Sequence, residues 1–152
     1  MMRLITRFVQ ERRQRQMWRR LAKALGIGRR PADSADVTPL RHVSTHMEIE
    51  WYARDIHPWD RDLPDKRKAA LFAEGSLAHT ATAIRRAFER FPEVTSVSIR
   101  VLAPRKPHGI LFAGSVSRLD LAGVPENLSP AMTLKLLGIT YQMSDGVLEP
   151  LT

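Results

Sequence analysis

The sequence predicts an α+β fold: a small, mainly antiparallel sheet with helices packed on one face, preceded by a basic N-terminal helix. The first observation behind this is the order of the hydrophobic patterns, which runs helix, strand, strand, helix, strand, strand, with a further strand in front. An antiparallel sheet covered by helices satisfies that order most simply. The second is length, because 152 residues suit one domain with tails. The third is composition, since 43% hydrophobic and 26% charged residues indicate a chain with a buried core.

Residues 1–28 are predicted to form a basic helical arm. Straight-chain residues that favour helices dominate positions 2–25, and Gly26 and Gly28 supply a stop. The apolar side chains of this segment fall into two groups on different sides of the helix: Leu4, Ile5, Phe8 and Val9 in one, and Met17, Trp18, Leu21 and Leu25 in the other. Because a core-facing helix keeps a single apolar stripe, this change of phase favours docking onto a partner. The alternative is a solvated helix packed loosely on its own domain.

A linker is predicted over residues 29–45, where Pro31, Pro39 and short polar residues outnumber apolar ones. A compact α+β domain is then expected over residues 46–152. Its first segment, 46–51, alternates apolar residues with acids. This alternation predicts a half-exposed strand, and a helix running on into the following residues is the alternative.

The clearest helical pattern spans residues 64–91, where apolar side chains recur at spacings of three and four. It follows a turn over residues 57–62. Pro64 suits the first turn of the helix, and Asp62 is a candidate N-cap. Gly75 and Ser76 mark a point at which the segment could divide into two helices, with Ser76 capping the second.

Residues 95–101 and 110–117 alternate apolar and polar side chains, which predicts two strands of an antiparallel hairpin with a long loop. One face of this hairpin carries small polar residues and one cation: Ser96, Ser98, Arg100, Ser115 and Ser117. That face is either solvated or a contact surface for a partner or a sugar-phosphate backbone.

The last elements are predicted from their terminating residues. Ser129 followed by Pro130 is typical of a helix N-terminus, and Gly138 of a helix C-terminus, so a short helix is expected between them. Asp145 followed by Gly146, between two apolar stretches, predicts a closing hairpin.

The positive charge of the chain is confined to its N-terminal part. Residues 1–31 hold nine Arg and one Lys against one Glu, a net charge of +9. Residues 32–152 hold fourteen Arg and Lys against fifteen Asp and Glu, a net charge of −1, so the two parts give the +8 of the whole chain. Such asymmetry indicates a segment that meets a polyanion, an acidic surface or a membrane.

We expect the basic side chains of the arm, with a second pair in the hairpin loop, to contact phosphates. The candidate nucleic-acid-binding residues are Arg3, Arg7, Arg12, Arg13, Arg15, Arg19, Arg20, Lys23, Arg29, Arg30, Arg105 and Lys106. Arg outnumbers Lys nine to one in the arm, which favours bidentate contacts over diffuse attraction.

The sequence lacks the residues or motifs that several kinds of catalytic and metal-binding site require. There is no cysteine, which excludes disulfides, a thiol nucleophile and thiolate metal sites. The His, Asp and Glu residues of 42–62 are the richest candidate metal ligands, but their pattern is interpreted as a polar, acidic segment. No serine-nucleophile motif and no phosphate-binding glycine loop occurs. No catalytic residue, metal site or cofactor is therefore predicted.

The function expected from the sequence is that of a non-catalytic interaction protein whose arm binds a polyanion, most simply RNA or DNA phosphates. The alternative is docking of the amphipathic arm on a membrane surface or on an acidic protein. An enzyme of unrecognised type is the third hypothesis. The absence of cysteine suits a reducing compartment, so a cytoplasmic location is expected.

Overall fold

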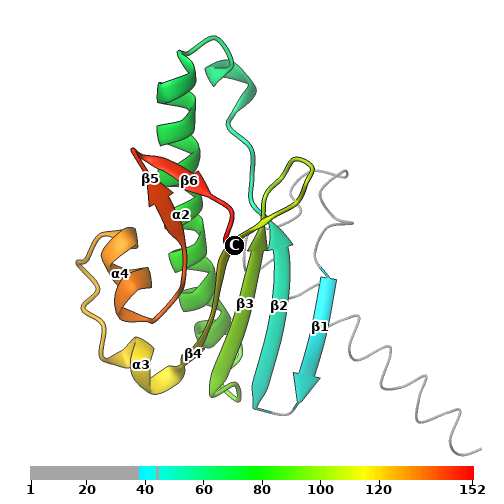
Figure 1. The fold of residues 1–152 in the computed structure, drawn as a ribbon. Helices are drawn as coiled ribbons and strands as arrows, with labels where there is room; N and C mark the ends of the chain where they lie inside the picture. Colours follow the sequence, from blue (N-terminus) through cyan, green and yellow to red (C-terminus); the bar gives the residue numbers. More distant parts are fainter. Residues whose placement is uncertain (1–37, 44) are drawn as a thin grey trace, which may run out of the picture.

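The computed structural model describes residues 38–43 and 45–152, and it contains one main sheet, a small hairpin and four helical segments (Figure 1). In chain order the elements are β1 (Thr38–Val43), β2 (His46–Tyr52), the 3-10 helix η1 (Pro58–Asp60), α2 (Asp65–Arg90), β3 (Ser96–Leu102), β4 (Ile110–Ser117), α3 (Arg118–Ala122), α4 (Pro130–Leu136), β5 (Gln142–Ser144) and β6 (Val147–Glu149). The predicted α+β class is confirmed for this part of the chain.

The main sheet is mixed, with its strands in the order β1-β2-β3-β4. The β1–β2 and β3–β4 pairs are antiparallel, whereas β2 and β3 are parallel. A parallel pair needs a crossover connection, and α2 provides it by returning the chain to the start of the sheet (Figure 1). The sequence predicted a mainly antiparallel sheet, and the crossover adds one parallel pairing to it.

The core lies between α2 and the inward face of the sheet. The parallel register places Met47 opposite Val97, and Trp51 opposite Val101, and all four side chains are buried. This confirms the predicted strand at 46–51, and the helical alternative for that segment is wrong. The register also sends the polar residues of both strands to the opposite face, because successive side chains alternate along a strand.

Helix α2 is one continuous helix of 26 residues. Its start is confirmed near Pro64, which occupies the N-cap position without a side-chain hydrogen bond, so the Asp62 cap is wrong. The helix does not divide at Gly75, and Ser76 is a buried interior residue. Packing against the sheet on both sides of this point keeps the helix intact, and tertiary contacts of this kind often override local propensity.

The predicted β3–β4 hairpin and the C-terminal elements are confirmed. Ser129 Oγ accepts a hydrogen bond from the Met132 amide at the start of α4, and Gly138 follows the helix with φ +73°. Asp145 and Gly146 both have positive φ in the turn between β5 and β6, as a tight hairpin requires. The structure adds α3, which the sequence analysis missed.

Strand β1 lies within the stretch predicted as a linker. It pairs with β2 at the edge of the sheet, and its register shifts between Pro39 and Arg41. An edge position beside such an irregularity tolerates a proline, which cannot donate a ladder hydrogen bond. The composition of the predicted linker therefore gave no signal for β1, because this strand depends on its pairing with β2. The predicted arm, 1–28, and the rest of the linker up to residue 37 lie outside the described residues.

Candidate functional site

Of the predicted phosphate-binding residues, the structure describes the two in the β3–β4 loop. The ten others, Arg3 to Arg30, lie outside the described residues. Arg105 donates from Nε and Nη2 to Asp55 Oδ2, at 3.0 and 2.8 Å. Its side chain is 79% exposed, and Lys106 beside it is exposed as well. The loop therefore presents two cations, one of which already has a carboxylate partner.

The polar face of the sheet is linked by hydrogen bonds among its own side chains. Ser98 Oγ bonds Ser115 Oγ across β3 and β4, and His46 Nδ1 lies 2.6 Å from Ser96 Oγ. Arg100 donates to Glu50 on β2. Two further positions of the face do not add positive charge: Glu48 is acidic, and Ser117 Oγ caps α3. A face of this composition does not favour binding to phosphates, so we place none of the proposed contacts on it.

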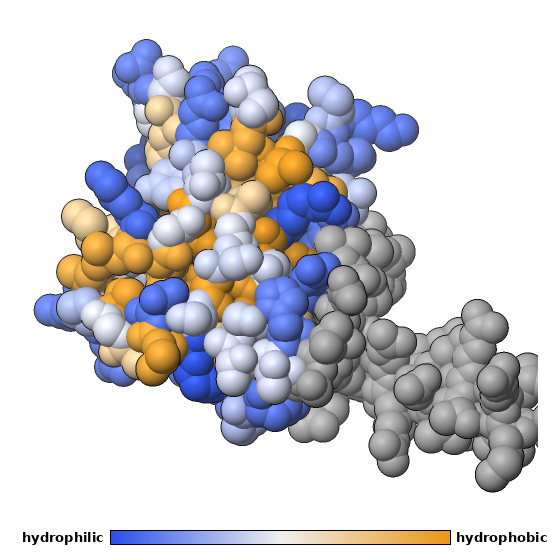
Figure 2. Space-filling model, turned by 60° about the horizontal axis from the view of Figure 1, so that its bottom comes forward, coloured by the Kyte–Doolittle hydropathy of each residue, from blue (hydrophilic) through white to orange (hydrophobic). Residues whose placement is uncertain are grey.

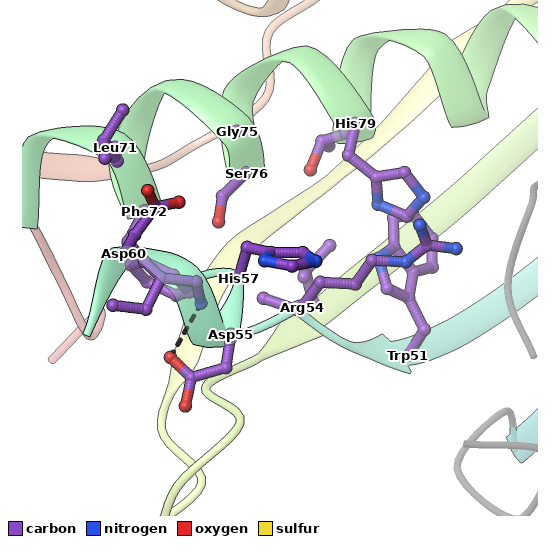
Figure 3. Close-up of a pocket in the computed structure, with 14 residues that line it drawn as sticks. Trp51, Arg54, Asp55, His57, Asp60, Leu71, Phe72, Gly75, Ser76 and His79 are labelled. Atoms are coloured by element: carbon purple, nitrogen blue, oxygen red, sulfur yellow. Dashed lines mark hydrogen bonds between the residues drawn. The ribbon is translucent and has the colours of Figure 1, made fainter. Parts of the chain in front are cut away.

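A cavity of about 340 Å³ lies between the end of β2 and the N-terminal half of α2. It forms because the chain leaves β2 at Tyr52, turns through η1 and enters α2 only at Asp65. Figure 3 shows Ser76 and His79 extending from α2 toward His57 and Trp51 below. The cavity is also lined by apolar residues: Ala53, Ile56, Leu71, Phe72 and Val101.

Two buried polar atoms at this cavity have no hydrogen-bond partner among the described residues: Trp51 Nε1 and Ser76 Oγ. Trp51 is 1% exposed and Ser76 is 7% exposed. A buried polar group without a partner costs on the order of 1–3 kcal/mol, so such groups are rare away from functional sites. Both residues belong to elements fixed by the core.

Each histidine that lines the cavity has an identified contact. His57 Nδ1 accepts a hydrogen bond from the Trp59 amide at 3.2 Å, so in the neutral ring the proton is on Nε2, which is then a donor. His79 meets the Trp51 ring edge to face, with ring centroids 6.2 Å apart.

The charged side chains of the cavity differ in whether they already have an ion-pair or hydrogen-bond partner. Arg54 is exposed and forms no ion pair with a described residue. Asp55 accepts from Arg105 and from the Ile56 amide, so its oxygens are already in use. Asp60 also lines the cavity, and Figure 3 shows it at the end away from Arg54. The end formed by Trp51 and Arg54 is therefore rich in donors.

No pattern in the sequence points to this cavity. The acidic and histidine-rich stretch 42–62 holds the richest candidate metal ligands, and the structure places their side chains in different parts of the molecule. Asp55, His57 and Asp60 line the cavity, whereas Glu48 and Glu50 lie on the outer face of the sheet. In the described part of the chain, no three His, Asp or Glu side chains converge as a metal site. No local signal could have found Trp51 and Ser76, because each fits an ordinary core or cap pattern.

None of the described helices combines the length and the apolar composition that a membrane span requires. Comparisons with protein-family models, with curated proteins and with solved structures find no match to this chain.

Proposed function

We propose that this protein is a non-catalytic interaction protein whose Arg-rich N-terminal segment binds RNA or DNA through the phosphates. The observation that carries the proposal is the division of charge, +9 over residues 1–31 and −1 over residues 32–152. A cluster of cations on an otherwise neutral chain gives affinity for a polyanion, because each neutralised phosphate releases condensed counterions.

The type of cation supports phosphate as the target. Nine of the ten cations in the segment are arginines, whose planar guanidinium group makes two parallel hydrogen bonds to phosphate oxygens. Such contacts position a protein on nucleic acid without reading its sequence. Arg105 and Lys106 form a secondary pair in this proposal, in which Lys106 contributes more because Arg105 is bound to Asp55.

Docking on a protein or a membrane surface is the second candidate, and one observation favours it. Several large apolar side chains of the C-terminal elements are exposed, from 40% to 85%: Leu119, Met132, Leu136, Met143 and Val147. Figure 2, which turns the end of the molecule with α3 forward, shows apolar surface interspersed with charged side chains. Exposed apolar surface of this kind marks interaction sites.

The experiment is a binding assay of the full chain against labelled RNA, duplex DNA and anionic phosphatidylserine vesicles. The test variant replaces Arg12, Arg13, Arg15, Arg19 and Arg20 by Gln. A matched control removes five exposed cations of the described domain: Arg61, Lys66, Arg67, Arg86 and Arg90. We expect the test variant to bind nucleic acid much more weakly at physiological salt and the control to keep most of its affinity. Loss confined to vesicle binding, together with sensitivity to Phe8→Ala and Trp18→Ala, would favour the membrane candidate instead.

A further inference from the structure

We propose that the cavity between β2 and α2 binds a small organic monocarboxylate with an apolar body. This inference is independent of the proposed nucleic-acid binding and concerns a different part of the chain. Its starting point is the pair of buried polar atoms, Trp51 Nε1 and Ser76 Oγ, that no described residue satisfies. Both residues line the same cavity.

The ligand must supply hydrogen-bond acceptors. An indole N–H only donates, a guanidinium group only donates, and the His57 ring donates from Nε2 when its Nδ1 accepts the Trp59 amide. Three donors of the cavity, from Trp51, Arg54 and His57, therefore need hydrogen-bond acceptors. The Ser76 hydroxyl can form a fourth hydrogen bond, either as donor or as acceptor. The two oxygens of a carboxylate carry about four acceptor sites, so one carboxylate matches these donors in number.

A single negative charge fits the charges of the cavity. Arg54 is the lining cation without an acidic partner among the described residues, since Asp55 is bound by Arg105. Asp60 lies at the opposite end, where it repels a second anionic group. A phosphate, which carries close to two charges, is matched less well by one guanidinium group than a carboxylate is.

The apolar lining and the volume of the cavity determine which kind of ligand body fits. Ile56, Leu71 and Phe72 offer apolar surface to the cavity. The volume of about 340 Å³ lies at the lower end of the range for small-molecule sites. An aromatic or short aliphatic acid of about ten non-hydrogen atoms suits this size, with a Kd on the order of 1 mM.

The test is an NMR titration of the ¹⁵N-labelled full chain with phenylacetate, phenylacetamide and inorganic phosphate. The readout is the indole N–H signal of Trp51, and the backbone amide signal of Gly146, in the β5–β6 turn outside the cavity lining, is the internal reference. We expect saturable movement of the Trp51 signal by phenylacetate, about tenfold weaker binding of the neutral amide, and no comparable effect of phosphate.

Two variants complete the test, each checked for folding by the dispersion of its spectrum. Arg54→Gln is expected to weaken phenylacetate binding about tenfold and to abolish the preference over the amide. Ser76→Ala is expected to weaken both probes, because the hydroxyl bond does not depend on charge. Arg86→Gln, an exposed α2 arginine outside the cavity, is the matched control and should change nothing.

The proposal fails if phenylacetate does not move the Trp51 signal saturably, or if phenylacetamide binds as well as phenylacetate. It also fails if inorganic phosphate moves the signal as much, because the apolar body would then play no part. None of these three results bears on the arginines of the N-terminal segment, so failure here leaves the nucleic-acid proposal untouched.

Discussion

Arg118 holds together the C-terminal end of α2 and the loop that leads from it to β3. Its Nη2 donates to the carbonyl oxygens of Phe88, Phe91 and Val94, at 2.7 to 3.1 Å, and its Nε donates to Val94 as well. The guanidinium group also lies 5.0 Å from the centroid of the Phe88 ring. The last carbonyls of a helix have no partner within the helix, and the negative end of its dipole attracts a cation.

Replacing this residue tests that role. We expect Arg118→Ala to lower the free energy of unfolding by about 2–3 kcal/mol, because several partly buried carbonyls lose a charged donor at once. Urea denaturation measures the difference. Arg86→Ala removes an exposed cation of the same helix and should change the value by less than about 0.5 kcal/mol. Equal effects of the two substitutions would show that the Arg118 contacts add no stability.

At the scale of an element, Gly114 lets the C-terminal segment approach β4. A Cβ atom there would lie 2.9 Å from Ile139 Cδ1 and 3.2 Å from Ile139 Cα. The neighbouring Ala113 forms an isolated bridge with Thr140, so the two backbones are held at this distance. The glycine is therefore required by the close approach of two chain segments.

Two glycine substitutions should shift stability in opposite directions. Gly114→Ala is expected to destabilise the fold by about 1–3 kcal/mol, the usual cost of overpacking. Gly75→Ala should stabilise it by up to about 1 kcal/mol, because an alanine Cβ meets nothing within 4 Å there and alanine favours the helix interior. Thermal unfolding followed by circular dichroism compares the two. A lower melting temperature for Gly75→Ala would contradict the account of α2 as one unstrained helix.

The elements that the sequence predicts correctly are those with local signals. Ser129 and Gly138 bound α4, and Asp145 with Gly146 fixes the last turn, because capping and positive φ are decided within a few residues. The continuity of α2 and the presence of β1 depend on distant partners, so local breakers such as Gly75 and Pro39 were misleading. The hydroxyl of Ser117, which accepts from the Asp120 amide, was a local signal for α3 that was overlooked.

At the scale of the whole molecule, the two proposed activities rest on different kinds of information. The charge division is visible in the sequence, because counting residues requires no fold. The cavity is not visible in the sequence, because Trp51 and Ser76 come to line one space only when α2 crosses the sheet. The sequence pattern placed Trp51 at an apolar position of a half-exposed strand, and the structure buries it in the core. Whether its Nε1 has a partner depends on which atoms surround it in the fold.

The salt dependence of nucleic-acid binding tests the central claim most directly. Binding of the full chain to duplex DNA, measured over a range of salt concentrations, should give a log–log slope of about −0.9 for each phosphate contacted. The five Arg→Gln substitutions at positions 12, 13, 15, 19 and 20 should reduce the magnitude of that slope by about 4.5 if each arginine contacts one phosphate. An unchanged slope, or no binding by the full chain at low salt, would contradict the claim that this segment binds nucleic acid.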